Sequence, residues 1–260
     1  MERIDLRGRK GLVVGVANED SLAWQAARHF RQAGADLALT YLNDKAKPHV
    51  EPLARQLEAP LFLPCDVTVP GQLDAVFQSI REHWGRLDFL FHSIAWARKE
   101  ELHGRLTDCS AEGFAESMVV SCHSLIRMAR LAEPLMDRGG SIMTLSYFGA
   151  EKVVDHYNVM GPVKAALEAS VRYLAHELGR GNIRVNAISA GAVRTRAASG
   201  IEHFDELINE SARRAPLRRT VEACEVGRTA LVLASDYTTG VTGEVLHVDA
   251  GAHSAGMVFH

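Results

Sequence analysis

The sequence predicts an α/β fold, a doubly wound domain in which a parallel sheet of seven strands carries helices on both faces. Seven short apolar runs recur along the 260 residues, and helix-compatible segments follow them. The runs are almost continuously apolar rather than alternating, which is typical of strands buried on both faces of a parallel sheet. No linker, low-complexity tract or internal repeat interrupts them. We therefore expect a single domain, residues 1–260.

The predicted strands and helices alternate along the chain. The strands are the runs 11–17 (GLVVGVA), 35–41 (ADLALTY), 61–67 (LFLPCDV), 87–95 (LDFLFHSIA), 141–147 (SIMTLSY), 183–191 (IRVNAISAG) and 244–251 (EVLHVDAG). The helices are Leu22–Gln32, Val50–Leu57, Gly71–Trp84, Ala111–Met136, Val163–Leu178 and Glu222–Ala234. In the helix from Val163, apolar residues recur at helical spacing and Gly179 provides a natural stop. A ligand of such a fold binds beyond the carboxyl ends of the strands.

The charge balance, the cysteines and the histidines exclude several classes of function. With 29 Lys and Arg against 32 Asp and Glu, the chain has no large basic field for nucleic acid or an anionic membrane. No Cys-x2-Cys pair and no His-Glu-x-x-His motif occurs, so we predict neither a metal site nor a redox motif. The first ten residues are charged rather than signal-like, and no apolar run is long enough to span a bilayer. We expect a cytoplasmic protein with reduced thiols.

The turn after the first predicted strand is the candidate phosphate site of a Rossmann-type cofactor groove. It lacks Gly-x-Gly-x-x-Gly and offers only Gly15 and, after five residues, Ser21. Backbone N–H groups near Ser21 and Leu22 would point at a pyrophosphate, although the turn also suits an ordinary helix start with Asp20 or Ser21 as N-cap. Three later strands end in small or polar groups, at 66–67, 93–95 and 189–191. Aligned at one edge, these strand ends favour a dinucleotide groove.

The end of the second predicted strand bears on the choice of nicotinamide cofactor. An acidic residue there binds the ribose 2′-hydroxyl and repels a 2′-phosphate. The segment reads LTYLNDK, so Asp44 comes slightly late and Lys45 follows it. We predict NADH as the cofactor and leave NADPH open.

The fifth predicted strand leads into SYFGAEKVVDHYNVMGPVK, which supplies Tyr147, Tyr157 and Lys164. Here the chain resembles the short-chain dehydrogenase/reductase superfamily and, more closely, the NADH-dependent enoyl-acyl-carrier-protein reductases of bacterial type II fatty acid synthesis. The resemblance runs through GLVVGVANEDSLAW, TYLNDK, CDV, HSIA, LSYFGAE, YNVMGPVK, VNAISAGAVRTRAASGI and GEVLHVDAG, so it covers nearly the whole chain. Its most specific features are Gly15 with Ser21, the two tyrosines, and the six residues between Tyr157 and Lys164.

The resemblance implies a reaction, site residues and partners. The reaction is reduction of the C2=C3 double bond of trans-2-enoyl thioesters by NADH, with Tyr157, Lys164 and Tyr147 as catalytic residues. The cofactor would be bound by Gly15, Ser21, Leu22, Asp66, Val67, Ser93, Ile94, Lys164, Val193, Arg194, Thr195, Arg196 and Ala197. The acyl group would be bound by Ala97, Tyr147, Tyr157, Met160, Ile201 and Phe204. A homotetramer is also expected by resemblance, because superfamily members commonly form tetramers.

The spacing of Tyr157 and Lys164 has a chemical consequence. In ordinary superfamily members the acid is a tyrosine four residues before the lysine, a position that Met160 occupies here. A thioether donates no hydrogen bond, so carbonyl reduction in the usual geometry has lost its acid. If the helix extends back to Tyr157, that residue is displaced by about 4.5 Å along the axis. A hydroxyl set back in this way can meet the thioester oxygen, on which the charge of an enolate develops.

The neighbours of Tyr157 complete the expected site. Lys164 would hydrogen-bond the nicotinamide ribose and favour the phenolate of a nearby tyrosine, which makes that hydroxyl a stronger donor. Tyr147 would share protonation or wall the acyl pocket, and both roles stay open. Pro162 suits only the first turn of a helix, so the regular helix is expected to begin between Asn158 and Gly161.

Three departures from the family pattern concern the cofactor loop, the last strand and the carrier. Ala192 stands where relatives often have proline, and the last strand ends in VDAG rather than Asp-Gly-Gly. The helix expected over the acyl site is acidic (GIEHFDELINE), which disfavours docking of an acidic carrier protein there. Nearby arginines would bind the carrier instead or form an ordinary solvated or subunit surface: Arg194, Arg196, Arg213, Arg214, Arg218 and Arg219. The carrier is left open between acyl carrier protein and coenzyme A.

Two other functions stand as alternatives. A carbonyl or 3-oxoacyl thioester reductase of the same superfamily is disfavoured by Met160, which removes the usual acid. A non-catalytic NAD(P)-binding sensor is disfavoured by the intact Tyr157 and Lys164, because a sensor needs neither residue.

Overall fold

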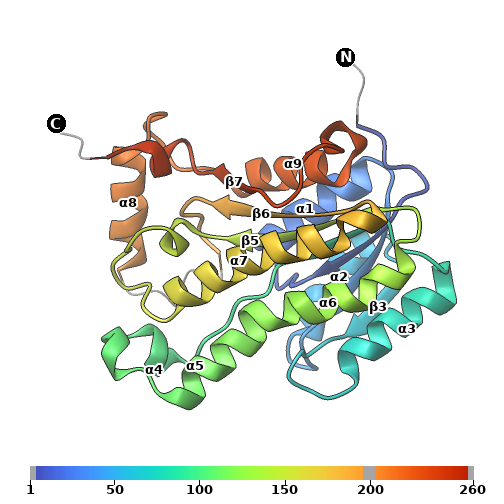
Figure 1. Cartoon of the computed structure of the whole chain (residues 1–260), viewed down its shortest axis with the longest axis horizontal. Helices are drawn as coiled ribbons and strands as arrows, with labels where there is room; N and C mark the ends of the chain where they lie inside the picture. Colours follow the sequence, from blue (N-terminus) through green and yellow to red (C-terminus); the bar gives the residue numbers. More distant parts are fainter. Residues whose placement is uncertain (1–3, 196–202, 257–260) are drawn as a thin grey trace.

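A parallel sheet forms the centre of the molecule (Figure 1). The computed structural model describes residues 4–195 and 203–256. Within this part of the chain, seven parallel strands are hydrogen-bonded in the order β3-β2-β1-β4-β5-β6-β7. They are β1 (Lys10–Val14), β2 (Asp36–Tyr41), β3 (Leu61–Pro64), β4 (Phe89–His92), β5 (Gly140–Ser146), β6 (Ile183–Ala190) and β7 (Val245–Val248). The predicted fold is confirmed, and the reversal of strand order between β1 and β4 creates a crevice at the carboxyl ends.

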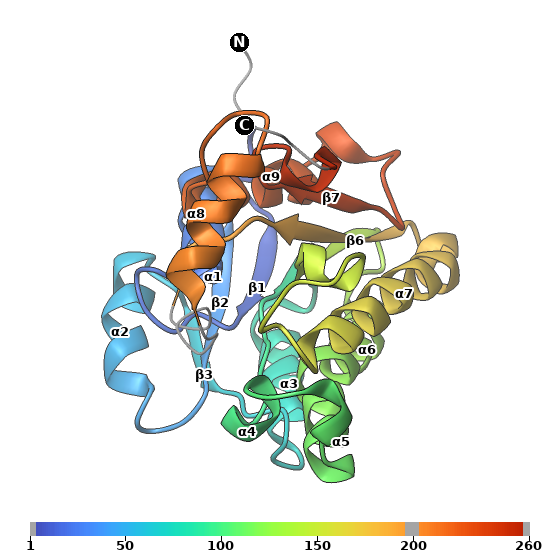
Figure 2. The ribbon, with the colours of Figure 1, turned by 90° about the vertical axis from the view of Figure 1, so that its left-hand side faces the viewer.

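Helices cover both faces of the sheet (Figure 2). One face carries α1 (Leu22–Gln32), α2 (Lys47–Gln56) and α9 (Ala223–Ala234), and the other carries α3 (Gln72–Trp84), α6 (Ser124–Ala132) and α7 (Met160–Leu178). Towards the carboxyl ends of the strands lie α4 (Lys99–Leu102), α5 (Ala111–Met118) and α8 (Phe204–Arg214). Among the helices of residues 4–195 and 203–256, none is both long and apolar enough to cross a membrane.

Two apolar cores lie between the sheet and its helices. On the α1 face, Phe30 packs against Phe89 and Phe91, with ring centroids 4.7 and 6.0 Å apart. On the α7 face, the predicted helical stripe that includes Val163 and Val171 is buried. Full burial of one such side chain stabilises a fold by roughly 1.5–3 kcal/mol. These cores therefore fix the layers that hold the strand ends.

The helix predicted over Ala111–Met136 is interrupted. After α5 the chain forms a π-helical turn, Val119–His123, before it continues as α6. In this turn Ser121 Oγ accepts a hydrogen bond from Trp96 N (2.8 Å) and donates one to Trp96 O (3.0 Å). Single π turns inside α-helices occur frequently at functional sites. Apolar periodicity did not predict the turn, because one locally widened turn leaves the apolar faces of the flanking helices intact.

Several helix boundaries differ from the prediction by a few residues. α2 begins at Lys47 rather than Val50, because Pro48 lies in the first turn, where a helix needs no N–H donor. α7 begins at Met160 rather than Val163, inside the interval expected from Pro162. The single-turn helix α4 was not predicted, because four residues are too short to show a period.

Candidate active site

The carboxyl ends of β1 and β4 meet at Gly15. Its φ of 107° lies in the left-handed region that favours glycine. A Cβ at this position would lie 1.9 Å from the carbonyl oxygen of Ser93, so a side chain would push the two strand ends apart. The backbone N–H of Ser93 also donates to the carbonyl of Val14 (2.9 Å). Two of the predicted cofactor residues, Gly15 and Ser93, are thus in contact at the crevice.

The loop from Gly15 to Ser21 leads into α1. Ser21 Oγ accepts a hydrogen bond from Trp24 N (3.3 Å) and donates one to Asn18 O (2.7 Å). The alternative interpretation of Ser21 as an N-cap is therefore confirmed. The side-chain oxygen of Asn18 is buried, and within the described residues it has no hydrogen-bond partner. A buried acceptor without a partner costs about 1–3 kcal/mol, so Asn18 is suited to bind a hydrogen-bond donor of a ligand.

The end of β3 places Asp66 and Val67 at the same edge of the sheet. Asp66 Oδ1 accepts hydrogen bonds from Thr68 N (2.9 Å) and Thr68 Oγ1 (2.6 Å). The carbonyl oxygen of Val67 accepts one from Arg127 (2.8 Å), which ties this loop to α6. These bonds fix the two predicted cofactor residues at the end of β3.

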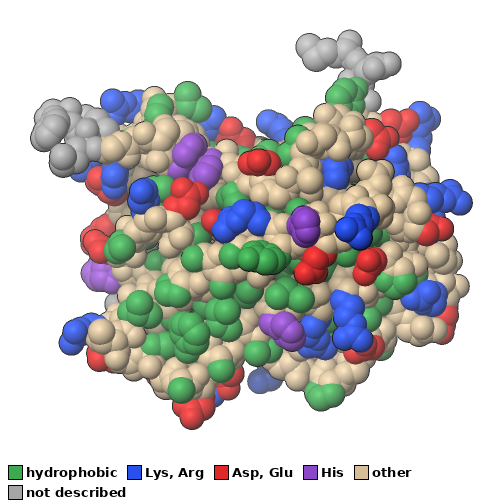
Figure 3. Space-filling view, in the orientation of Figure 1, with side chains coloured by type: hydrophobic (Ala, Val, Ile, Leu, Met, Phe, Trp, Pro, Cys, Tyr) green, Lys and Arg blue, Asp and Glu red, His purple; other side chains and the backbone are tan. Residues whose placement is uncertain are grey.

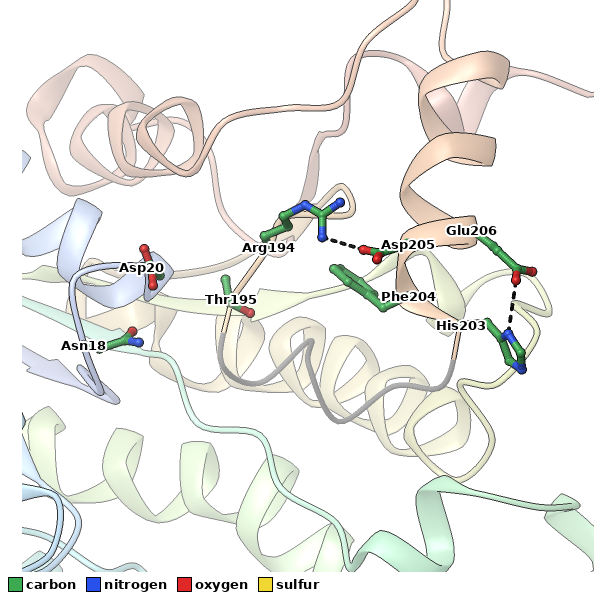
Figure 4. A pocket seen from close by; sticks show the side chains of 8 residues that line it. All are labelled: Asn18, Asp20, Arg194, Thr195, His203, Phe204, Asp205 and Glu206. Carbon is green, nitrogen blue, oxygen red and sulfur yellow. Dashed lines mark hydrogen bonds and ion pairs between the residues drawn. The ribbon is translucent and has the colours of Figure 1, made fainter.

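A cleft of about 840 Å³ opens between the β1–α1 loop and the chain around the start of α8 (Figure 4). Its lining residues are Asn18, Asp20, Arg194, Thr195, His203, Phe204, Asp205 and Glu206. Arg194 forms an ion pair with Asp205, and the ring of Phe204 lies beside this pair. A cleft of this size accommodates a small-molecule cofactor. The predicted site residues Arg196, Ala197 and Ile201 lie outside the described residues.

The segment that follows β6 is packed against the end of β7. A Cβ on Gly191 would lie 2.9 Å from the Cα of Asp249, so the two strand ends approach closely. Ala192 is buried. Val193 packs against a small apolar cluster that includes Val221 and Ala250. The next two predicted cofactor residues, Arg194 and Thr195, line one side of the cleft.

Tyr157 and Lys164 are both buried beside the end of β5, with exposed fractions of 8 % and 5 %. The Lys164 ammonium donates to the carbonyl oxygen of Leu145 (2.7 Å). The ring of Tyr147 meets that of Tyr157 edge to face, with centroids 4.8 Å apart. The structure therefore brings together the three predicted catalytic side chains: Tyr147 and Tyr157 touch, and Lys164 reaches the carbonyl two residues before Tyr147.

Tyr157 lies in a turn outside α7. The residues on both sides have positive φ, 64° at His156 and 37° at Asn158. Non-glycine residues in this region store backbone strain, which clusters at functional sites. The Asn158 side chain donates to the carbonyl oxygen of Leu102 (2.6 Å), which anchors the turn. The displacement of about 4.5 Å along a helix axis therefore does not apply, because α7 begins only at Met160.

Burial dominates the electrostatics of the site. It lowers the pKa of Lys164 to about 8, although Glu168 acts in the opposite direction. It raises the pKa of Tyr147 to about 12, with Asp249 adding to the effect. The pKa of Tyr157 is also raised, first by burial and then by Tyr147 and Glu168. Tyr157 is therefore a neutral hydrogen-bond donor at physiological pH, and the expected effect of Lys164 on its phenolate stays a prediction.

The residues predicted to bind the acyl group divide between two places. Ala97, Tyr157 and Met160 belong to one apolar cluster, and Tyr147 packs against it. Phe204 lies at the first residue of α8, in the cleft. The region near Tyr157 thus combines apolar walls with hydroxyl donors. No three His, Cys, Asp or Glu side chains of the described chain come together in a way that could hold a metal ion.

Two buried polar residues of the site, Ser121 and Glu168, were not predicted. Ser121 holds Trp96, which directly precedes the predicted acyl residue Ala97. Glu168 accepts a hydrogen bond from Ser146 Oγ at the end of β5. The available signal was a polar residue on the apolar face of a predicted helix, because such a group is nearly always hydrogen-bonded when buried.

The family model described as enoyl-(acyl carrier protein) reductase matches residues 15–253, which include every residue of this site. The chain belongs to this reductase family. It is 52% identical over 252 residues to the NADH-dependent enoyl-acyl-carrier-protein reductase 1 of Rhizobium meliloti, a match that covers 97% of this chain and 93% of the relative.

Solved structures of enoyl-acyl-carrier-protein reductases have the same fold. The enzyme of Anaplasma phagocytophilum in complex with NAD superposes with a TM-score of 0.94 at 52% identity, covering 99% of this chain and 98% of that one. The enzyme of Bacillus cereus with NADP+ and indole naphthyridinone superposes with a TM-score of 0.95 at 47% identity, covering 98% of this chain and 100% of that one.

Proposed function

We propose that this chain reduces the C2=C3 double bond of trans-2-enoyl thioesters with NADH, as an enoyl-acyl-carrier-protein reductase of fatty acid elongation in the cytoplasm. One observation carries the proposal: Tyr157 and Lys164 are buried together, while the position four residues before the lysine is a buried methionine, Met160. The usual acid for carbonyl reduction is therefore missing, whereas a second hydroxyl is kept nearby. The four cysteines are free, in keeping with a reducing compartment.

Tyr157 would donate a hydrogen bond to the thioester oxygen. Because its pKa is raised, the phenol stays protonated, and it can stabilise the negative charge that develops on that oxygen as an enolate forms. The bound dinucleotide supplies the hydride that is added at C3. Lys164 has two N–H groups beyond the one bonded to Leu145 O, and these would hold the nicotinamide ribose. Tyr147 would close the wall of the acyl pocket against Tyr157.

The residues at the sheet edge fit a dinucleotide. Gly15 lets the ends of β1 and β4 approach closely, and Asn18 has a buried oxygen without a partner in the described chain. Asp44, exposed just after β2, favours a free ribose 2′-hydroxyl over a 2′-phosphate. The NADH dependence of the Rhizobium meliloti relative agrees with this choice.

The carrier is proposed to be acyl carrier protein, which docks at the carboxyl-terminal end of α8. The first turn of that helix is acidic, with Asp205 and Glu206. Beyond it, Arg214 and Arg218 bond to backbone carbonyl oxygens, and among the described residues neither forms an ion pair. Their free positive charge would attract an acidic carrier.

A homotetramer is proposed to form through α5, α6 and α7. Hydrophobic side chains gather on this face (Figure 3). Its exposed members are Phe114, Val119, Ile126 and Tyr173. A second copy of the chain would cover them, because soluble monomers rarely expose large apolar patches. We expect Ile126→Arg to reduce the mass measured by analytical ultracentrifugation, whereas Leu42→Arg, exposed in the loop after β2, leaves it unchanged.

The decisive experiment compares two substrates. Purified protein is mixed with NADH and a crotonyl thioester, then with NADH and a 3-oxoacyl thioester, and the loss of NADH absorbance is followed. We expect turnover of the crotonyl thioester. Turnover of only the 3-oxoacyl substrate would overturn the proposal in favour of carbonyl reduction, and NADH binding without turnover of either would favour a sensor.

A further inference from the structure

Two hydrogen bonds join the end of β5 to the buried face of α7. The Lys164 ammonium donates to the carbonyl oxygen of Leu145 (2.7 Å), and Ser146 Oγ donates to Glu168 Oε1. Lys164 and Glu168 lie one helical turn apart, whereas Leu145 and Ser146 are consecutive. Both charged side chains are buried, Glu168 with an exposed fraction of 6 %. The two bonds therefore fix the strand exit that leads into Tyr147.

The charge of Glu168 needs an explanation. A buried carboxylate is unfavourable unless it is paired, and burial indeed raises the pKa of Glu168. A glutamine at this position could accept the same hydrogen bond from Ser146 without any charge to desolvate. The hydrogen bond alone does not account for a carboxylate here, and Lys164 is the group that gains from its charge.

Lys164 is close to losing its proton at physiological pH. Burial lowers its pKa to about 8, and the groups that oppose this loss are Glu168 on α7 and Cys122 on the π turn. On the β4 side, burial and then Lys164 lower the pKa of His92 to about 3, so the imidazole is neutral and adds no charge. The ammonium is present below about pH 8 and is lost as the pH rises through that value. Glu168 shifts this loss to higher pH.

Other charged groups act on Glu168 from three directions. Glu151, which follows the turn after Tyr147, raises its pKa, whereas His247 on β7 and Arg172 on α7 lower it. The hydroxyl of Ser146 also lowers it, because a hydrogen bond to a carboxylate favours the ionised form. Ser146, His247 and Arg172 thus oppose the effect of burial on Glu168, whereas Glu151 adds to it.

We propose that Glu168 is a positioning residue that keeps Lys164 in its ammonium form and, through Ser146, fixes the end of β5 beside it. The proposal rests on the proposed function, in which Lys164 holds the cofactor ribose. Glu168 acts through Lys164 and Ser146, and its effect on the reaction depends on pH because the ammonium does.

Glu168→Gln tests the charge while it keeps an acceptor for Ser146. The measurement is NADH affinity by fluorescence titration between pH 6 and 9, which requires no enoyl substrate. We expect the affinity to fall about fivefold at pH 8.5 but to stay within about twofold at pH 6.5, because the variant loses the ammonium at lower pH. Glu177→Gln removes an exposed carboxylate from the same helix, and its pH profile should match that of the wild type.

A uniform loss across the pH range, or no loss at all, would overturn the proposal, since a merely structural role has no reason to depend on pH. If Glu168→Gln does not fold, Glu168→Asp is measured instead. This variant keeps the charge, so its NADH affinity should fall at the same alkaline pH as that of the wild type. A fall at lower pH contradicts the proposal. A wild type that binds NADH but reduces no enoyl thioester would refute the proposed function alone, because the affinity profile is measured without that substrate.

Discussion

The two sides of the crevice are built in opposite ways. On the β5–α7 side, Tyr157 and Lys164 are almost fully buried, Tyr157 against the ring of Tyr147 and Lys164 with a hydrogen bond to Leu145 O. On the other side, formed by the β1–α1 loop and the chain that follows β6, the side chains of Arg194 and Asp205 are 68% and 74% exposed. Charges in a buried site interact strongly, whereas exposed pairs are weakened by water and salt. The buried side is suited to stabilise a developing charge, and the open side to admit a large cofactor.

This difference implies that the two sides contribute by different means. The buried side depends on particular functional groups, so removal of one hydroxyl or one charge changes the chemistry. The open side depends on backbone shape, as at Gly15, where a side chain would collide with the neighbouring strand end. Substitutions should therefore affect turnover on one side and cofactor affinity on the other.

The largest effect is expected from Tyr157→Phe. Loss of a hydrogen-bond donor aimed at a developing oxyanion lowers turnover by about 100-fold, whereas NADH affinity should change by less than about twofold. Steady-state kinetics and NADH titration separate the two quantities. Lys164→Ala is the matched comparison and should weaken both, because its ammonium is proposed to bind the ribose. Full activity in Tyr157→Phe would assign the donor role to Tyr147 or to water.

Gly15→Ala should damage the cofactor side instead. The new Cβ collides with the carbonyl of Ser93 and the backbone has positive φ, so we expect about tenfold weaker NADH binding and a loss of about 2–3 kcal/mol of stability. Thermal unfolding and NADH titration measure these effects. Gly8→Ala is the control, because Gly8 also has positive φ but no atom lies near its Cβ position. Equal effects of the two substitutions would show that the collision is unimportant.

Much of this architecture was accessible from the sequence. Continuous apolar runs predicted all seven strands, because a strand that is buried on both faces consists almost entirely of apolar residues. Pro162 predicted where α7 begins. These features depend on residues that are close together in the sequence, so a local sequence pattern is enough to predict them.

The missing parts depend on contacts between distant segments. The Ser146–Glu168 hydrogen bond joins residues 22 positions apart, so no local sequence pattern predicts it. The π turn at Ser121 is recognisable only through its bonds to Trp96, 25 positions away. The raised pKa of Tyr157 follows from burial, which is a property of the assembled core. For that reason the sequence did not predict it.

Asn158→Ala should have a moderate effect on the buried side. It removes the bond to Leu102 O and places an alanine at a positive φ, so we expect a loss of about 1–2 kcal/mol of stability and several-fold lower turnover. Asn182→Ala provides the control, since Asn182 also has positive φ but lies before β6, at the opposite end of the sheet. Circular dichroism melts and steady-state rates compare the two. A similar loss of turnover in both variants would mean that general destabilisation, rather than the Tyr157 turn, limits activity.

The smallest effect is expected from Asp205→Asn in the open cleft. This substitution breaks the ion pair with Arg194, but exposed pairs contribute little, so the KM for NADH should stay within about twofold of the wild type. The residual change should be larger at low ionic strength, where screening is weaker. Initial rates at two salt concentrations test this, with Arg194→Ala as the partner variant. A tenfold change in KM at physiological salt would mean that exposed charges contribute much of the NADH binding energy. The proposed contrast between the two sides of the crevice would then be wrong.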